Sequence, residues 1–89
     1  GKKILTKKLK KLKINFFPTN TNFLLIKLNT NRIRDQIIKY LVKRNFLVLG
    51  ESKLLGGDKI IRITLGPAQY MRNLSSNIEN FFKKQLYYE

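Results

Sequence analysis

The chain has 89 residues, 43% of them hydrophobic, and is sized for a single domain over residues 1–89 rather than for a disordered tail. It has no cysteine and no histidine, which excludes disulfides and thiolate metal sites and removes the commonest general base. A net charge of +14 with only five carboxylates argues against a two-carboxylate hydrolase; it indicates a polyanionic partner or, as we favour, a compositional bias toward lysine, asparagine and isoleucine.

Residues 2 to 13 predict an amphipathic helix. Its leucines recur at i, i+4 and i+7, the spacing of one helical face, and seven lysines crowd the remaining positions. We expect the leucines to pack on a sheet and the lysines to be solvated, although the same pattern suits a membrane surface or a phosphate backbone.

The two apolar runs that follow predict strands. Ile14–Phe17 is short, whereas Phe23–Leu28 is apolar at nearly every position, as expected of a strand that is buried on both faces. Between them, Pro18–Thr21 has the composition of a turn.

A second helix is predicted from an N-cap among Asn29–Asn31 to about Arg44. Asn45 can adopt the left-handed conformation that ends a helix. The expected buried stripe of this helix, with the residues that broaden it, is Ile33, Ile37, Leu41, Ile38, Tyr40 and Val42.

Two further strands are predicted in the second half. Phe46–Leu49 is a short apolar strand, and Gly50–Asp58 is a glycine-marked loop whose Gly56–Gly57 pair suits a tight turn better than a phosphate cradle. Lys59–Leu65 alternates, which places its odd-numbered isoleucines on one face and Arg62 on the other.

The last predicted element is a helix that Pro67 opens, since proline suits a first helical position. Its buried face is predicted to consist of Met71, Leu74, Ile78, Phe81 and Phe82. The complete order is helix, strand, strand, helix, strand, strand, helix. Segregated apolar faces then predict an α+β fold, a two-layer sandwich in which helices cover one face of a small sheet.

Arg62 interrupts an otherwise apolar strand. A buried guanidinium is costly unless it is paired, and a planar fork on a rigid strand suits a carboxylate, which it can hold through two parallel hydrogen bonds. The residues by themselves leave two interpretations open, and the simpler one is an arginine on the exposed face of the sheet.

Four segments together resemble the C-terminal small domain of class I/II pyridoxal-phosphate-dependent aminotransferases of the histidinol-phosphate aminotransferase type. Pro18–Leu25 is similar to the family's P-S-x-x-N-F segment, and Asn45–Val48 resembles its short strand after the helix. Ile61–Gly66 is similar to its L/I-R-I-T-x-G strand, and Gln69–Met71 follows at the family's spacing. The resemblance covers nearly all of this chain and about the last quarter of such an enzyme.

The resemblance implies that Arg62 binds the α-carboxylate of an amino-acid substrate. Asn22 matches the family asparagine, and we expect it to cap the turn into the strand rather than to bind substrate. Family members carry a second arginine that helps to hold the substrate phosphate, but the matching position here is Leu49. This departure leaves two alternatives open, histidinol phosphate and a substrate with a less anionic side chain. We interpret Tyr40 and Tyr70 as packing residues rather than as stacking platforms.

The family's Schiff-base lysine and its other cofactor contacts belong to a large domain that has no counterpart in this sequence. Pyridoxal phosphate is therefore expected only in a longer parent, a homodimer in amino-acid biosynthesis, in which this chain contacts the large domain of the same protein. We predict no catalytic, cofactor or metal residue in this chain, and no transamination by the chain alone.

Other classes of function remain open at this stage. The charge allows a small basic nucleic-acid-binding module, although the strands lack the aromatic pattern of a sheet-type RNA binder and no GXXG loop is present. A stand-alone interaction domain that reuses the fold is a third alternative. No run reaches the roughly 18 apolar residues of a membrane span, and the basic start resembles no signal peptide, so we expect a cytoplasmic protein without a membrane partner.

Overall fold

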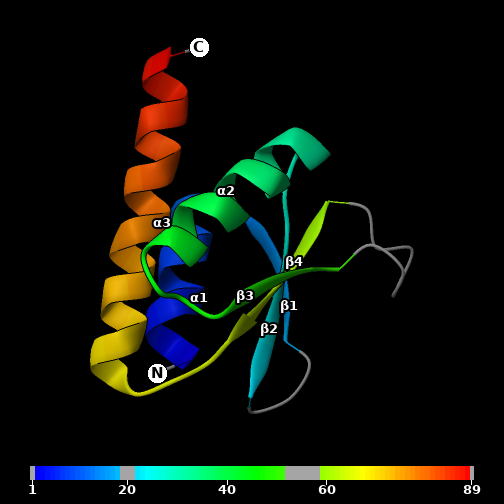
Figure 1. The fold of residues 1–89 in the computed structure, drawn as a ribbon. Coiled ribbons are helices and arrows are strands. Elements are labelled where there is room, and N and C mark those ends of the chain that lie inside the picture. Colours follow the sequence, from blue (N-terminus) through cyan, green and yellow to red (C-terminus); the bar gives the residue numbers. More distant parts are fainter. Residues whose placement is uncertain (1, 19–21, 52–58, 89) are drawn as a thin grey trace.

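The structure is a computed structural model that describes residues 2–18, 22–51 and 59–88. The predicted order of helices and strands is confirmed (Figure 1). The elements are α1 (Lys2–Lys11), β1 (Asn15–Pro18), β2 (Phe23–Lys27), α2 (Asn31–Lys43), β3 (Val48–Glu51), β4 (Ile60–Thr64) and α3 (Ala68–Tyr88).

The strands form one antiparallel sheet in the order β1-β2-β4-β3. The three helices lie on one side of it, as Figure 1 shows, so the predicted two-layer α+β sandwich is confirmed. The other face carries no described helix. Strand β4 is central and pairs with β2 on one side and with β3 on the other.

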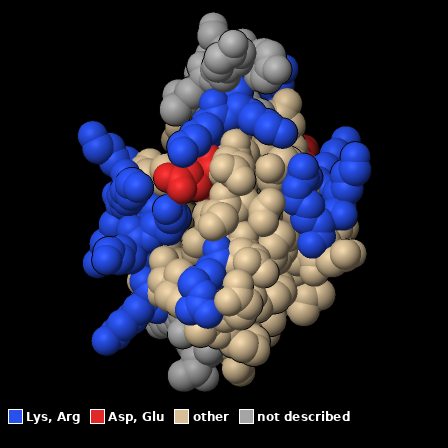
Figure 2. Space-filling view, turned by 90° about the vertical axis from the view of Figure 1, so that its left-hand side faces the viewer, with Lys and Arg blue, Asp and Glu red and all other residues tan. Residues whose placement is uncertain are grey.

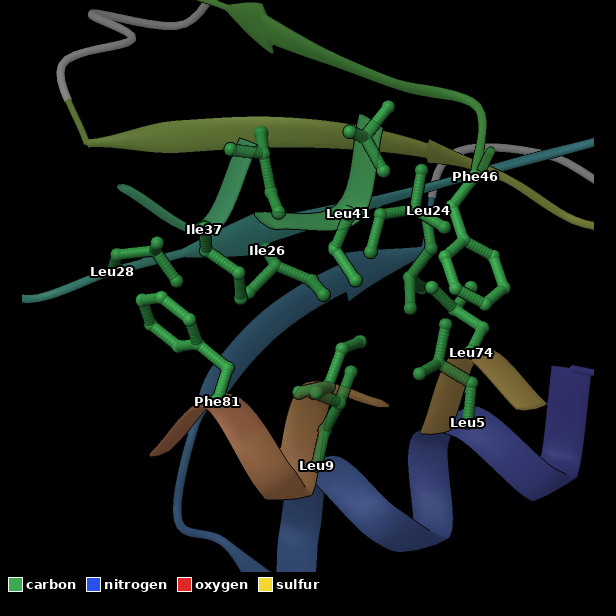
Figure 3. Packing of buried hydrophobic residues seen from close by; sticks show 14 of the residues in the cluster. Leu5, Leu9, Leu24, Ile26, Leu28, Ile37, Leu41, Phe46, Leu74 and Phe81 are labelled. Carbon is green, nitrogen blue, oxygen red and sulfur yellow. The ribbon is translucent and has the colours of Figure 1, made fainter. Parts of the chain in front are cut away.

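The core lies between the sheet and the helices, where side chains from both layers point toward one another (Figure 3). Leu5 and Leu9 of α1 are fully buried, which confirms that this basic helix uses its leucines for packing. The other residues with no exposed surface are Leu24, Leu41, Ile61, Ile63, Met71, Leu74 and Ile78.

An ion pair also joins α1 to α3. The Lys8 ammonium donates a hydrogen bond to Glu79 Oε1 at 2.9 Å, and Lys11 Nζ lies 3.6 Å from Oε2. The hydrogen bond from Lys8 lowers the pKa of Glu79 from 4.5, and the positive charges of Lys8, Lys11 and Lys83 lower it further, against a smaller opposing effect of burial.

Helix α2 begins and ends as predicted. Thr30 is its N-cap and accepts a hydrogen bond from the Ile33 backbone N–H at 3.0 Å. Asn45 adopts the expected left-handed conformation with φ of 69°. The prediction for Val42 was wrong, because this side chain is 50% exposed. It follows Leu41 by 100° around the helix, which turns it away from the buried stripe.

Strand β3 begins two residues later than predicted, at Val48. The Phe46 backbone N–H donates to the Leu41 carbonyl at 3.0 Å. This hydrogen bond closes the C-terminal end of α2, so the Phe46 N–H does not pair with a neighbouring strand. Gly50 was predicted to open a loop but lies in β3, where a Cβ would come within 3.2 Å of Ile38 in α2. Its small size lets the helix approach the strand.

Other boundaries moved by one or two residues, and α1, predicted over residues 2 to 13, ends at Lys11. Pro67 directly precedes α3, and its carbonyl accepts from the Met71 N–H at 3.0 Å. Pro18 belongs to β1, and the rest of the turn predicted at Pro18–Thr21 lies outside the described residues. The same holds for most of the predicted loop Gly50–Asp58, including the Gly56–Gly57 turn.

Candidate functional site

Arg62 lies at the centre of the sheet on the face that no described helix covers. Its neighbours in β4, Ile61 and Ile63, are fully buried against the helices, and side chains alternate along a strand, so Arg62 points the other way. Across the sheet it pairs with Leu25 of β2 and Leu49 of β3. The predicted alternation is therefore confirmed, and Arg62 is not sealed beneath a helix.

Several of the described neighbours of Arg62 are apolar. Its guanidinium carbon lies 4.9 Å from the centre of the Phe23 ring, a cation–π distance. Phe17, Leu25, Arg62 and Leu49 form one row across the four strands, and Phe17 and Leu49 remain 45% and 56% exposed. An apolar surface thus flanks a partly buried cation.

The described strands carry few positive charges. The four strands contain only two cationic residues, Arg62 and Lys27, and Lys27 is exposed at the end of β2. A guanidinium on a central strand, beside an aromatic ring, has the planar fork that can bind a carboxylate through two parallel hydrogen bonds.

Asn22 lies at the edge of this arrangement, just before β2. It is exposed, and its backbone carbonyl accepts a hydrogen bond from the Leu65 N–H at 2.8 Å. This bond lies next to the last pair of the β2–β4 ladder, Phe23 and Thr64. The structure therefore brings Asn22 to the same end of the sheet as Phe23. The capping role of its side chain stays a prediction.

The two tyrosines both contact aromatic rings. Tyr70 packs edge-on against Phe46 with 5.4 Å between ring centres, and its hydroxyl accepts from the Leu47 N–H. Tyr40 packs edge-on against Phe81, also at 5.4 Å. The interpretation as packing residues fits both, but sequence reasoning missed that Arg44 covers the Tyr40 ring. The i, i+4 spacing of these two residues on α2 was the available signal.

The search for metal and membrane features gives two negative findings. Within residues 2–18, 22–51 and 59–88, no group of three or more Asp or Glu side chains is placed to hold a metal ion. None of the helices in these ranges is both long and apolar enough to cross a bilayer.

Comparisons with known proteins define the class of fold. No family model matches the chain, and no curated protein matches it. Among solved structures, the fold is shared with the small domain of an aminotransferase.

The matching structure, at 1.80 Å resolution, is described as a candidate histidinol-phosphate aminotransferase from Erwinia carotovora atroseptica SCRI1043. The TM-score is 0.74 at 24% sequence identity, and the match covers 94% of this chain but 23% of that protein, in its C-terminal part. The predicted resemblance in fold is thereby confirmed, and this chain spans less than a quarter of the matched protein.

Proposed function

We propose that this chain is the small domain of a pyridoxal-phosphate-dependent aminotransferase and that Arg62 binds the α-carboxylate of its amino-acid substrate. The single observation that carries the proposal is the position of Arg62. It is the cation of a central strand, on the helix-free face of a fold that aminotransferases use. On that face a large domain could complete a cleft around the guanidinium.

The chemistry required of Arg62 is binding and orientation. A guanidinium fork fixes both oxygens of a carboxylate and so sets the direction of the neighbouring Cα–H bond. The Phe23 ring on one side restricts the guanidinium plane, because Arg62 lies over it at 4.9 Å. Preorganisation of this kind lowers the cost of positioning the substrate.

Leu49 bears on the choice of substrate. It is the cross-strand neighbour of Arg62 and is more than half exposed. A leucine at this point offers apolar contact and no charge to a substrate side chain. We therefore propose an amino acid whose side chain is uncharged or weakly anionic, rather than a phosphorylated one.

The described strands offer no lysine that fits pyridoxal phosphate. A Schiff-base lysine is activated by desolvation or by a neighbouring cation, whereas Lys27, the lysine of the described strands, is exposed. The cofactor, which supplies an electron sink when it is bound, would be held by the large domain of a longer parent. Amino-acid binding at Arg62 is then the contribution of this chain.

The experiment has two steps. The reading frame upstream of Gly1 should encode roughly 250 residues with an S-x-x-K motif, a size typical of a separate domain. In the complete enzyme, Arg62→Lys should raise the KM for the amino acid by about tenfold or more, because an ammonium lacks the fork.

A matched control and a second substrate make this test specific. Arg72→Lys changes an exposed arginine on α3 and should leave the KM unchanged. The amine that lacks the α-carboxylate should react equally well with the Arg62→Lys enzyme and with the unchanged enzyme. Equal losses for amino acid and amine, or no loss for either, would rule out carboxylate binding by Arg62.

A further inference from the structure

A groove of about 460 Å³ lies between α2 and α3, and neither the sequence motifs nor the proposed function accounts for it. Its volume falls in the range of small-molecule sites, but it is largely open to solvent. Four cations surround two aromatic rings in its walls: Lys39, Lys43, Arg44, Lys84, Tyr40 and Phe81.

The aromatic part of the groove is a built stack. Phe81 supports the Tyr40 ring edge-on, and the guanidinium carbon of Arg44 lies 3.6 Å from the centre of the Tyr40 ring. The Arg44 Nη1 also donates to the Tyr40 carbonyl at 3.0 Å, which fixes the orientation of the guanidinium. Arg44 itself is exposed, so this stack presents a flat cationic face to solvent.

No described carboxylate compensates the charge of the groove. Among the described residues, none of the carboxylates lines it, and Lys39, Lys43 and Lys84 make no ion pair. The lysines of α1 differ, since Lys8 and Lys11 share Glu79. Clustered like charges repel one another, and a bound polyanion would relieve that repulsion.

We propose that this groove binds a single strand of RNA or DNA. The lysines would contact successive phosphates, and one base would stack on the guanidinium of Arg44 above Tyr40. Cationic grooves with planar stacking groups are the common design of single-strand binding sites. In Figure 2, which faces the helical side, basic side chains gather on both flanks of the surface.

The groove and Arg62 are separate. The groove is formed by helices α2 and α3, whereas Arg62 lies on the opposite face of the sheet. This proposal does not rest on the aminotransferase proposal, and either can fail without affecting the other.

The test uses the 89-residue chain and a fluorescein-labelled 15-residue oligouridine, with binding followed by fluorescence anisotropy. Replacing Lys39, Lys43 and Lys84 together by Gln should weaken binding more than about tenfold at low salt. The slope of log K against log salt should become shallower by about 2, since each phosphate contact with a single strand contributes about 0.7. These side chains are exposed, so circular dichroism melting should be unchanged.

The matched control replaces Lys3, Lys7 and Lys10 of α1 by Gln. These three lysines are exposed, like those of the groove. Both variants remove three charges, but the control should weaken binding less than about threefold. Equal weakening by the two variants would mean diffuse attraction to a basic protein and would overturn the proposal.

Arg44→Lys tests the stack at constant charge. The unchanged protein should prefer the oligonucleotide over one with abasic positions by about fivefold, and this preference should disappear in Arg44→Lys. No preference in the unchanged protein would refute stacking. Competition with ATP and inorganic phosphate separates the sources of phosphate. If ATP displaced the strand at equal nucleotide concentration, the site would be one for a mononucleotide and the strand proposal would be wrong.

Discussion

The two faces of this molecule differ in where they carry charge. Six Lys and Arg residues lie in α1, four in α2 and three in α3, but only two lie in the four strands. On the helical side, each cation is one of many. The groove between α2 and α3 is distinctive there because several cations without a described ion pair gather in it. Among the described strands, Arg62 is the only residue with a guanidinium, so its position on the helix-free face is the exceptional feature. Net charge therefore says little about function until each cation is assigned to a face.

The largest expected effect contrasts the two sides of the sheet. Ile61→Ala removes a fully buried side chain between sheet and helices and should lower the free energy of unfolding by about 2–5 kcal/mol. Leu49→Ala, on the helix-free face, should change it by about 0.5 kcal/mol or less. Urea denaturation of the 89-residue chain measures both. Similar losses for the two variants would contradict a one-sided core.

A smaller effect is expected at the start of α2. Thr30→Ala removes the acceptor for the Ile33 N–H and should destabilise the chain by about 1 kcal/mol. Thr30→Ser keeps the hydroxyl and serves as the control, with little expected change. A destabilisation by serine as large as that by alanine would show that the hydroxyl is not the stabilising group.

The smallest effect concerns the ion pair between α1 and α3, and pH reveals it. The folded-state pKa of Glu79 lies below 4.5, so its contribution to stability is present above about pH 4.5 and is lost as the pH falls through the folded value. Glu79→Gln should remove the loss of stability at acid pH that comes from this carboxylate and leave the contribution of the other titrating groups unchanged. Thermal melts at pH 7 and at acid pH measure it, and an unchanged pH profile in the variant would be the contrary result.

Most of the fold could be predicted because it follows from local periodicity. The leucine spacing predicted α1, and the alternation around Arg62 predicted which side chains of β4 face the core. Errors arose where tertiary contacts decided the outcome. The Phe46 N–H donates to the Leu41 carbonyl at the end of α2, and Gly50 pairs with Ile61 in β3, where its small size accommodates Ile38.

The sites were less predictable than the fold, for a related reason. Arg62 was found from its strand, but its contact with Phe23 depends on the pairing of β4 with β2. That pairing joins segments whose order in the sheet no local pattern specifies. The groove likewise forms only when α2 and α3 lie side by side. No pattern in the sequence therefore predicted that Lys84 lies near Arg44.

The pairing of β2 with β4 has a consequence for how this protein folds. Lys27 and Ile60 are paired although roughly 30 residues separate them, so this contact closes a much longer loop than a hairpin does. Arg62 lies in this non-local pairing. A partly folded form without the pairing of β2 and β4 would leave the guanidinium without its neighbours in β2. The geometry around Arg62 should thus form in a single cooperative step, together with completion of the sheet.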